Sequence, residues 1–493
     1  MKKDIFKIII PGVLFALLSA SCHKDELLSP VPSNSLADVS AFDNAARVSS
    51  QVGGLYAALK AGNLLGGRYF IYNDVRADNF INQTNNAVTA LQTWNYSLTS
   101  TNQEVIGLWA AAYSAINQCN VFLDGMKTKG NAVVGATLAA NYNAEAKLVR
   151  AICYYDMLQL YARPYWDGSG AKPGLPLRLT AIKGSGYSDL ARTTVDSIYK
   201  QIISDLDSAE AGLPLTYTSA TLNITRAHRN TAIALKTRVY LSMQNYAKVI
   251  TEANKIVTAT APFTATTGVA HALQSDITKV FVSPNTTTES ILSMPFVTGS
   301  DVPGTQNSVG SYYLPSSGYT NAGAGEYSLN ASGVVADPGW TATDKRRSFI
   351  FTTTDGKQWL IKYPLGTKTS YVDWTPVIRY SEVLLSLAEA RARSTNTVDA
   401  QAVALLNAVR NRSDAATTYT TASFANPTAL FNAILQERNI EFLGEGLRSP
   451  DLMRLGLTIP GKSVVNAVAP TDNSYIWPIS SNELLYNHLM SPN

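Results

Sequence analysis

Apolar side chains recur at helical spacing through two long stretches of this 493-residue chain, and this period restricts its fold more than any other feature. The first stretch includes Ala144, Leu148, Ala151, Tyr155 and Leu158. A helix predicted over residues 225–242, with Thr225 as its cap, is separated by a short turn from one predicted over 246–257. Two helices joined in this way form an αα-hairpin, the unit of tetratricopeptide-like arrays. The sequence therefore predicts a mainly α fold with a scaffold of tetratricopeptide-like helical hairpins, without a strict repeat of about 34 residues.

The helical period is lost over residues 261–375, where Thr, Gly, Ser, Pro and Asn are frequent. Short runs of apolar and aromatic residues at 290–294 and 358–362 predict isolated strands there. A long loop-rich insert in a compact protein is usually functional. We therefore expect this insert to carry a few short strands and to bind ligand.

Helical patterns return after the insert. Thr375-Pro376 favours a helix start, because Thr is a good cap and Pro suits the first helical position. Asn426-Pro427 repeats that signal further along. We expect a helical N-terminal region over residues 45–260 and a C-terminal region over 261–493, with helices at 376–456 followed by a tail.

The first 22 residues resemble a bacterial lipoprotein leader. Three lysines precede an apolar run at residues 8–18, which is too short for a membrane span of about 20 residues, and small residues precede Cys22. We expect residues 1–21 to be a lipoprotein signal peptide, Cys22 to be acylated, and residues 22–44 to form a flexible tether. The alternative is an ordinary signal peptide in which Cys22 is incidental.

Charged residues are sparse, at 15% of the chain against roughly 25% in typical soluble domains. The net charge of +4 is too small for a surface that follows nucleic acid. Uncharged polar residues and 25 tyrosines take the place of charge, which favours a neutral sugar over an anionic one as a ligand. Cys119 and Cys153 lie within apolar helical patterns and are expected to be buried free thiols.

Five sequence blocks resemble the SusD/RagB family. They lie at residues 145–161, 378–390, 407–412, 437–456 and 475–479, in family order. The block at 437–456 is similar to the family's E-R-x-x-E-x-x-x-E-G-x-R-x-x-D-L-x-R-x-G, with Asn439 where a second Arg is common. Ser381 likewise stands where Ala is usual.

The resemblance implies a lipoprotein that caps a SusC-like TonB-dependent outer-membrane transporter and holds an oligosaccharide, or in some members a peptide, at the channel mouth. It also implies a tetratricopeptide-like scaffold for the transporter and a ligand site built from loops. Lys24-Asp25-Glu26 resembles the surface-export signal of Bacteroidetes lipoproteins. The expected location is therefore the outward-facing surface of the outer membrane of a Gram-negative, Bacteroidetes-type bacterium, reached through a lipid anchor.

Aromatic residues in loops are candidates for ligand contacts, because sugar rings stack on Trp and Tyr while Asn, Asp and Arg bind the hydroxyls. The insert contributes Trp340, Trp359, Trp374, Tyr312 and Tyr319. A second group lies where starch-binding members of the family place a stacking Trp and its polar partners: Trp94, Asn95, Asp74 and Arg76. Trp109, within a helical pattern, is expected to be structural.

Two further motifs have structural explanations. Residues 456–463 match the phosphate-binding pattern G-x-x-x-x-G-K-S, but they follow a predicted helix, for which Gly456 is a suitable C-terminal cap. Glu437, Glu441 and Glu445 share one helical face, which would suit acid–base catalysis or a metal. Arginines close in sequence (Arg438, Arg448 and Arg454) favour an ion-pair lattice instead. We therefore expect no catalytic residue, metal or cofactor.

The combined prediction is a non-enzymatic, surface-tethered protein that captures a neutral oligosaccharide or polysaccharide for a partner transporter. Two alternatives stay open. One is peptide capture, as in the RagB branch of the family. The other is a lipid-anchored glycoside hydrolase with an (α/α)-type fold, which would need two carboxylates in a cleft.

Overall fold

The computed structural model describes residues 40–493, apart from residues 185, 187, 300, 305 and 366–370. The predicted signal peptide, Cys22 and most of the predicted tether therefore lie outside the described residues. Within the described part of the chain, none of the helices combines the length and the apolar character needed to cross a membrane.

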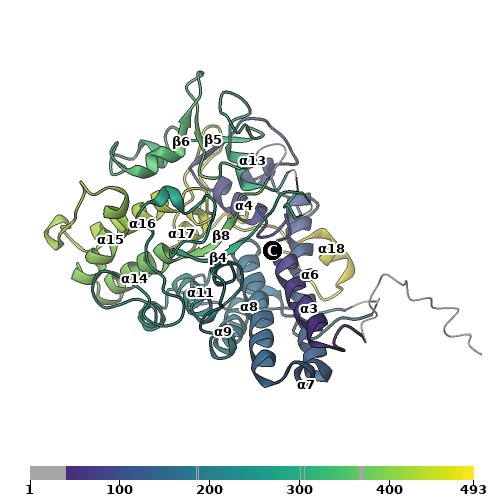
Figure 1. Ribbon diagram of the computed structural model, residues 1–493. Helices are drawn as coiled ribbons and strands as arrows, with labels where there is room; N and C mark the ends of the chain where they lie inside the picture. Colours follow the sequence, from purple (N-terminus) through teal and green to yellow (C-terminus); the bar gives the residue numbers. More distant parts are fainter. Residues whose placement is uncertain (1–39, 185, 187, 300, 305, 366–370) are drawn as a thin grey trace, which may run out of the picture.

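Helices pack in chain order into a curved array that runs from the lower right of Figure 1 to the left side of the molecule. Each of these contacts the next one in the series: α3 (Ala45–Leu59), α6 (Gln103–Gly125), α8 (Ala136–Tyr161), α9 (Val195–Gly212), α11 (Arg229–Ser242), α12 (Tyr246–Ala253), α14 (Tyr380–Thr395), α15 (Ala400–Ser413) and α16 (Pro427–Glu441). The prediction of a mainly α, hairpin-based scaffold is confirmed.

The hairpin of α11 and α12 shows how local sequence builds the array. Gln244 adopts a left-handed conformation (φ 57°), and the side chain of Asn245 accepts a hydrogen bond from the Lys248 N–H to cap α12. α11 ends at Ser242 as predicted, but it begins at Arg229 and not near Thr225. Thr225 instead ends the short helix α10 (Leu222–Thr225), since the chain becomes extended at Arg226.

The array continues across the insert, because α14 packs against α11 and α12. The predicted helix start at Thr375-Pro376 is wrong. These residues begin the strand β8 (Thr375–Arg379), which pairs antiparallel with β4 (Ser290–Met294) before α14 starts at Tyr380. Pro376 is tolerated because a two-stranded sheet has no central strand that needs its missing N–H.

The other strands of the described chain also form antiparallel pairs. β1 (Phe80–Asn82) pairs with β5 (Tyr327–Leu329), β2 (Pro173–Pro176) with β3 (Arg192–Thr194), and β6 (Ile350–Thr352) with β7 (Gln358–Leu360). The strands predicted at 290–294 and 358–362 are confirmed as β4 and β7. Together with α13 (Val309–Tyr313), β5 and β6 form the upper part of the molecule in Figure 1.

Short elements complete the fold. The short helices are α4 (Arg68–Arg76), α5 (Leu91–Trp94), α7 (Asn131–Val134), α17 (Arg448–Arg454) and α18 (Ser481–Tyr486). The π and 3₁₀ turns are η2 (Met126–Gly130), η3 (Ile277–Lys279), η4 (Val334–Ala336), η5 (Lys345–Phe349), η6 (Thr421–Ser423) and η7 (Asn473–Tyr475). The pair α4 and α17, distant in sequence, lie in contact.

The core of the described chain has one large apolar cluster, which runs through both the array and the insert, and two small ones. Cys119 and Cys153 lie in the large cluster as free buried thiols, as predicted, and burial raises the pKa of Cys119 to about 12. Trp109 is buried there too, with its ring edge-on to that of Tyr161 at a centroid distance of 5.0 Å. Its predicted structural role is confirmed.

Candidate functional site

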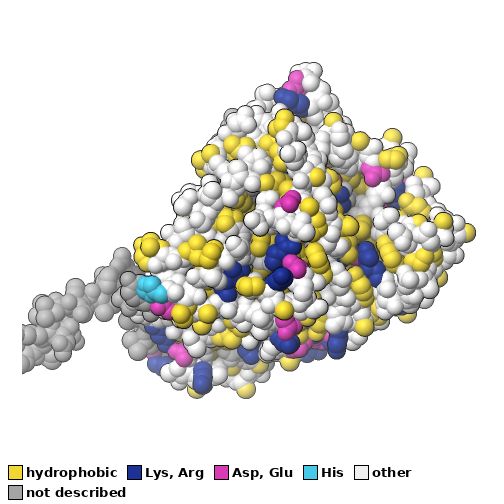
Figure 2. Space-filling model, turned by 180° about the vertical axis from the view of Figure 1, so that it is seen from behind, with side chains coloured by type: hydrophobic (Ala, Val, Ile, Leu, Met, Phe, Trp, Pro, Cys, Tyr) yellow, Lys and Arg dark blue, Asp and Glu magenta, His cyan; other side chains and the backbone are white. Residues whose placement is uncertain are grey.

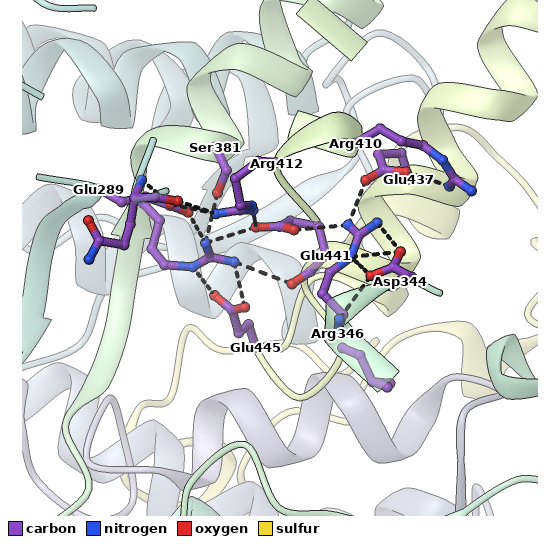
Figure 3. Close-up of polar contacts among 12 residues, drawn as sticks. Glu289, Asp344, Arg346, Ser381, Arg410, Arg412, Glu437, Glu441 and Glu445 are labelled. Carbon is purple, nitrogen blue, oxygen red and sulfur yellow. Dashed lines mark hydrogen bonds and ion pairs between the residues drawn. The ribbon is translucent and has the colours of Figure 1, made fainter. Parts of the chain in front are cut away.

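A buried charge network joins the insert to the C-terminal helices (Figure 3). Its carboxylates come from Glu289, Asp344, Glu437, Glu441 and Glu445, and its cations from Arg346, Lys362, Arg379, Arg410 and Arg412. The predicted ion-pair lattice is confirmed, but its expected partners are wrong. Arg438 and Arg454 pair with Asp451, and Arg448 pairs with Asp78. The three predicted glutamates pair instead with cations that are distant in sequence, such as Arg346 and Lys362.

Glu441 is the centre of this network. Its Oε1 lies 3.0 Å from Nη1 of Arg379, and its Oε2 lies 2.9 Å from Nη1 of Arg346. Burial alone would raise the pKa of Glu441, but Arg412, Arg379 and Arg346 together hold this pKa well below its usual range. A carboxylate held ionised by several guanidinium groups is a structural anion, and such a set does not provide the free acid–base pair that glycoside hydrolysis needs.

Lys462, the lysine of the phosphate-binding pattern, has a structural role. Its ammonium group is buried at the C-terminal end of α4, where it donates to the carbonyl groups of Val75, Arg76 (2.9 Å) and Ala77 (2.8 Å). A cation at a helix C-terminus is favourable because the last carbonyl groups have no partner within the helix. Gly456 follows α17 with φ 66°, as its predicted capping role requires.

Most of the predicted ligand residues are buried. The rings of Trp94, Trp340 and Trp359 are between 3% and 7% exposed. The Arg347 guanidinium lies 4.2 Å from the ring centroid of Trp340, and Trp94 Nε1 donates to the Phe80 carbonyl at 2.9 Å. Rings that are covered in this way have little surface left for a sugar in the described conformation.

The polar and tyrosine candidates show the same pattern. Tyr312 is buried and donates to the Gln306 carbonyl. Asp74 is buried and accepts a 2.8 Å hydrogen bond from Tyr313 Oη. Burial raises the pKa of Asp74 to about 8, although the Tyr313 hydroxyl acts in the opposite direction.

Three predicted residues are half-buried and lie on separate segments. Trp374 Nε1 is 3.3 Å from the Phe296 carbonyl, and the Tyr319 ring lies beside Phe351. Asn95 accepts hydrogen bonds from Ser97 within its own loop. Their contact with a ligand stays a prediction.

A cavity of about 620 Å³ is lined by one predicted residue, Arg76. Thr93 and Tyr96, which flank the predicted residues Trp94 and Asn95 in sequence, also line it. Three parts of the chain far apart in sequence form it: residues 76–100, the separate positions Arg163, Pro173 and Arg192, and the C-terminal segment 473–493. Its size is in the range of small-molecule sites, about 300–1,000 Å³. We take this cavity, called the pocket below, as the candidate functional site.

The pocket combines apolar walls with hydrogen-bonding groups. Its apolar surface comes from Tyr96, Leu98, Ile476, Trp477, Pro478, Ile479 and Leu484. Its polar groups belong to Arg76, Thr93, Ser100, Arg163, Arg192, Asn473, Ser474 and Asn493. Sugar rings need both kinds of surface, because their C–H faces are apolar and their hydroxyls are polar.

Tyr96 and Trp477 are fixed by contacts outside the pocket. Tyr96 adopts φ 60°, its hydroxyl donates to the Arg76 carbonyl, and its ring centroid lies 5.3 Å from Lys462 Nζ. The Trp477 ring packs edge-on against Tyr161, at a centroid distance of 5.5 Å. These contacts hold the pocket walls in place without a ligand.

No sequence pattern identified Arg163, Arg192 or the C-terminal tail as pocket residues. The block at 475–479 stood out by its resemblance, but only the folded chain places it opposite Tyr96.

Figure 2 shows the sparse charge of the surface: on this face most side chains are apolar or uncharged, and Lys and Arg gather near its middle.

Two family models match the chain. The family described as "Starch-binding associating with outer membrane" matches residues 30–241, and the SusD family matches residues 350–493. A SusD superfamily protein of known structure from Bacteroides fragilis is 34% identical, with a TM-score of 0.80, over 91% of this chain and 99% of that one. The chain belongs to the SusD/RagB family. Its tetratricopeptide-containing helical fold is that of the family.

Other SusD-like proteins are more distant. "SusD-like protein P2" of Formosa agariphila is 25% identical over the whole of this chain and 99% of its own length. Two solved structures share the fold with TM-scores of 0.72 over 91% of this chain and 99% of theirs. They are a "Laminarin binding SusD-like protein", at 19% identity, and "Surface glycan-binding protein A from Bacteroides uniformis", at 18%. Proteins of this family are associated with the outer membrane and bind glycans.

The described residues offer no evident metal site. Among them, no group of three or more His, Cys, Asp or Glu side chains is arranged to hold a metal ion.

Proposed function

We propose that this SusD/RagB protein captures a glycan in the pocket and passes it to a SusC-like TonB-dependent transporter in the outer membrane. The observation that carries the proposal is the pocket, in which the half-buried ring of Tyr96 adds aromatic surface to Asn, Ser, Thr and Arg side chains. The names of structural relatives that bind laminarin or surface glycans support the same class of ligand.

The proposed ligand contacts include residues predicted from the sequence and residues that only the structure places in the pocket. Arg76 contributes to the pocket together with Tyr96, and the half-buried Asn95 lies next to Tyr96 in the same loop. Trp374 and Tyr319, half-buried on the insert, would contact a part of the bound glycan that lies outside the pocket. Anchoring through acylated Cys22 would hold the protein on the outward-facing membrane surface.

The direct test uses the full-length lipoprotein in mild detergent, with affinity electrophoresis and calorimetry across a panel of neutral and acidic polysaccharides. We expect binding to at least one glycan, without release of reducing sugar. Absence of binding across the panel would overturn the proposal. Tight binding of mixed oligopeptides in its place would favour peptide capture, and release of reducing sugar would favour a glycoside hydrolase.

The transporter partnership needs a separate experiment. Extraction of native outer membranes with mild detergent should co-purify an outer-membrane barrel with this protein. A Cys22→Ala variant should no longer fractionate with the membrane. Recovery of the protein alone would contradict the proposed partnership.

A further inference from the structure

Three arginines line the pocket, and two of them, Arg76 and Arg192, form no ion pair with an Asp or Glu of the described chain. Arg76, Arg163 and Arg192 line it, and none of the described residues that line it is Asp or Glu. The carboxylates of neighbouring residues are already in use: Asp167 pairs with Arg163, Glu483 with Arg178, and Asp78 with Arg448.

Arg76 is the most unusual of these residues. It is 1% exposed, and its hydrogen bonds go to the Tyr475 carbonyl (2.7 Å) and the Met453 sulfur (3.5 Å). In the described part of the chain, its Nε has no hydrogen-bond partner, and it forms no ion pair with a carboxylate. Burial of a charge without a counter-ion is costly, and buried arginines are therefore normally paired.

The other buried arginines of this protein follow that rule with few exceptions. Arg150, Arg238 and Arg454, for example, each face a carboxylate at 2.6–2.7 Å. Arg68 has no ion pair among the described residues, but three oxygen acceptors surround it. Arg76 has one. Its position on the pocket wall distinguishes it from the rest.

Two more cations strengthen the positive potential. Lys462 lies next to Arg76, since its buried ammonium group donates to the Arg76 carbonyl and to two neighbouring carbonyl groups. Within the described chain, this ammonium group has no carboxylate at ion-pair distance. Arg192, on β3, donates to five neutral acceptors: the carbonyl groups of Gly174 (2.7 Å), Pro173 (3.0 Å), Ser491 (3.3 Å) and Pro492 (3.1 Å), and Asn493 Oδ1 (2.6 Å). Among the described residues, no carboxylate pairs with Arg192 either.

We propose that the glycan held in this pocket is acidic, and that its carboxylate or sulfate group serves as the missing counter-ion of Arg76, next to the second positive charge of Arg192. The proposal rests on the proposed function and specifies its substrate class. It also replaces the neutral ligand expected from composition, because a low overall charge does not describe the local charge of one pocket. Uronate and sulfate share the property that matters here, a group of anionic oxygen atoms that accept hydrogen bonds from guanidinium N–H groups.

The test compares glycans that differ in charge alone. Full-length protein in mild detergent is titrated with polygalacturonate and with its fully methyl-esterified form, and separately with a sulfated galactan and with the desulfated form of the same polymer. We expect at least one acidic member to bind about tenfold or more tightly than its neutral partner, with a preference that weakens as salt is added. The two pairs distinguish a carboxylate from a sulfate.

Variants connect the preference to the pocket. Arg192→Gln and Arg76→Gln should each reduce affinity for the acidic glycan by about fivefold or more. Arg391→Gln is the matched control, because it removes one positive charge from α14, where Arg391 pairs with Asp399 at 2.8 Å, and it should leave affinity unchanged. Circular dichroism confirms that each variant is folded, and Arg192→Gln keeps the test valid if Arg76→Gln does not fold.

The outcomes separate the two proposals. Binding of neutral glycans without preference for acidic ones would overturn this inference and leave glycan capture intact. An acidic preference that Arg391→Gln weakens as much as the pocket variants would also overturn it, because a general charge effect would then explain the data. Binding of acidic oligopeptides but of no glycan would overturn both proposals.

Discussion

The charge network and the pocket use the same residue type in opposite ways. In the network, Arg379 faces Glu289, Glu441 and Glu445, so its charge is neutralised within the protein. In the pocket, Arg76 is equally buried but faces a carbonyl group and a sulfur atom. A buried arginine with carboxylates holds elements together, whereas a buried arginine without one retains a charge that a ligand can meet.

The largest effect should come from breaking the network at its centre. Glu441→Gln leaves Arg346, Arg379 and Arg412 short of one buried negative charge. Loss of one partner from a buried pair typically costs about 3–5 kcal/mol, so the free energy of unfolding should fall by that order in a urea titration. The control is Asp355→Asn, whose ion pair with Lys357 is exposed to solvent, so its loss should leave stability nearly unchanged. Equal stability of the two variants would contradict a structural role for the network.

A smaller loss is expected at the cation behind the pocket. Lys462→Met removes the donor to the carbonyl groups of Val75, Arg76 and Ala77 and leaves them buried. A buried acceptor without a partner costs about 1–3 kcal/mol, which urea unfolding would measure. Lys462→Arg, which keeps the charge and the donors, is the control for side-chain loss. No change in Lys462→Met would show that the ammonium group does not cap α4.

Asp74 extends the comparison to a buried carboxyl that has no ion pair among the described residues. Its pKa of about 8 in the folded protein, raised by burial, lies above the ordinary value of 3.8. Between these values the folded state binds a proton that the unfolded state has lost, so stability should decrease as the pH rises from about 4 to 8. The slope from this one group is at most about 1.4 kcal/mol per pH unit.

The corresponding variant is Asp74→Asn, which cannot titrate and should flatten that slope. Urea unfolding at several pH values measures the effect. The slope of the Asp355→Asn control should match that of the unmodified protein. If Asp74→Asn keeps the original slope, another group is responsible for it.

The smallest stability effect is expected at the pocket rim. Arg192→Gln removes a half-buried cation that has no ion pair in the described chain, so the free energy of unfolding should change by no more than about 1 kcal/mol. Thermal unfolding would check this. A loss as large as that of Glu441→Gln would mean that Arg192 stabilises the fold, and the contrast between the two regions would fail.

Much of the scaffold could be predicted from sequence because its signals are local. The helical period and the Asn426-Pro427 cap identify α16, and the Asn426 side chain accepts a hydrogen bond from the Ala429 N–H as expected. The acidic face of α16 likewise indicated an ion-pair lattice. Its partners were not predictable, since Arg346 and Arg379 lie far from Glu441 in sequence.

The ligand residues stay a prediction. A Trp in a loop rich in Gly and Ser was expected as a candidate ligand contact, and Trp340 and Trp359 are buried in this structure because the insert packs against the core and its own strands. The Thr375-Pro376 error has a similar origin. A cap-like dipeptide favours a helix, but pairing with β4 decided the outcome.

The sequence by itself determined the repeating helices, the family and the class of function, since local periodicity and short motifs carry that information. The tertiary structure alone decided which charges are neutralised and where a ligand can fit. Residues 76–100, the separate positions Arg163, Pro173 and Arg192, and residues 473–493 form one pocket only when the array and the C-terminal tail are folded together. Whether an arginine is paired depends on neighbours that are distant in sequence, and no local pattern encodes them.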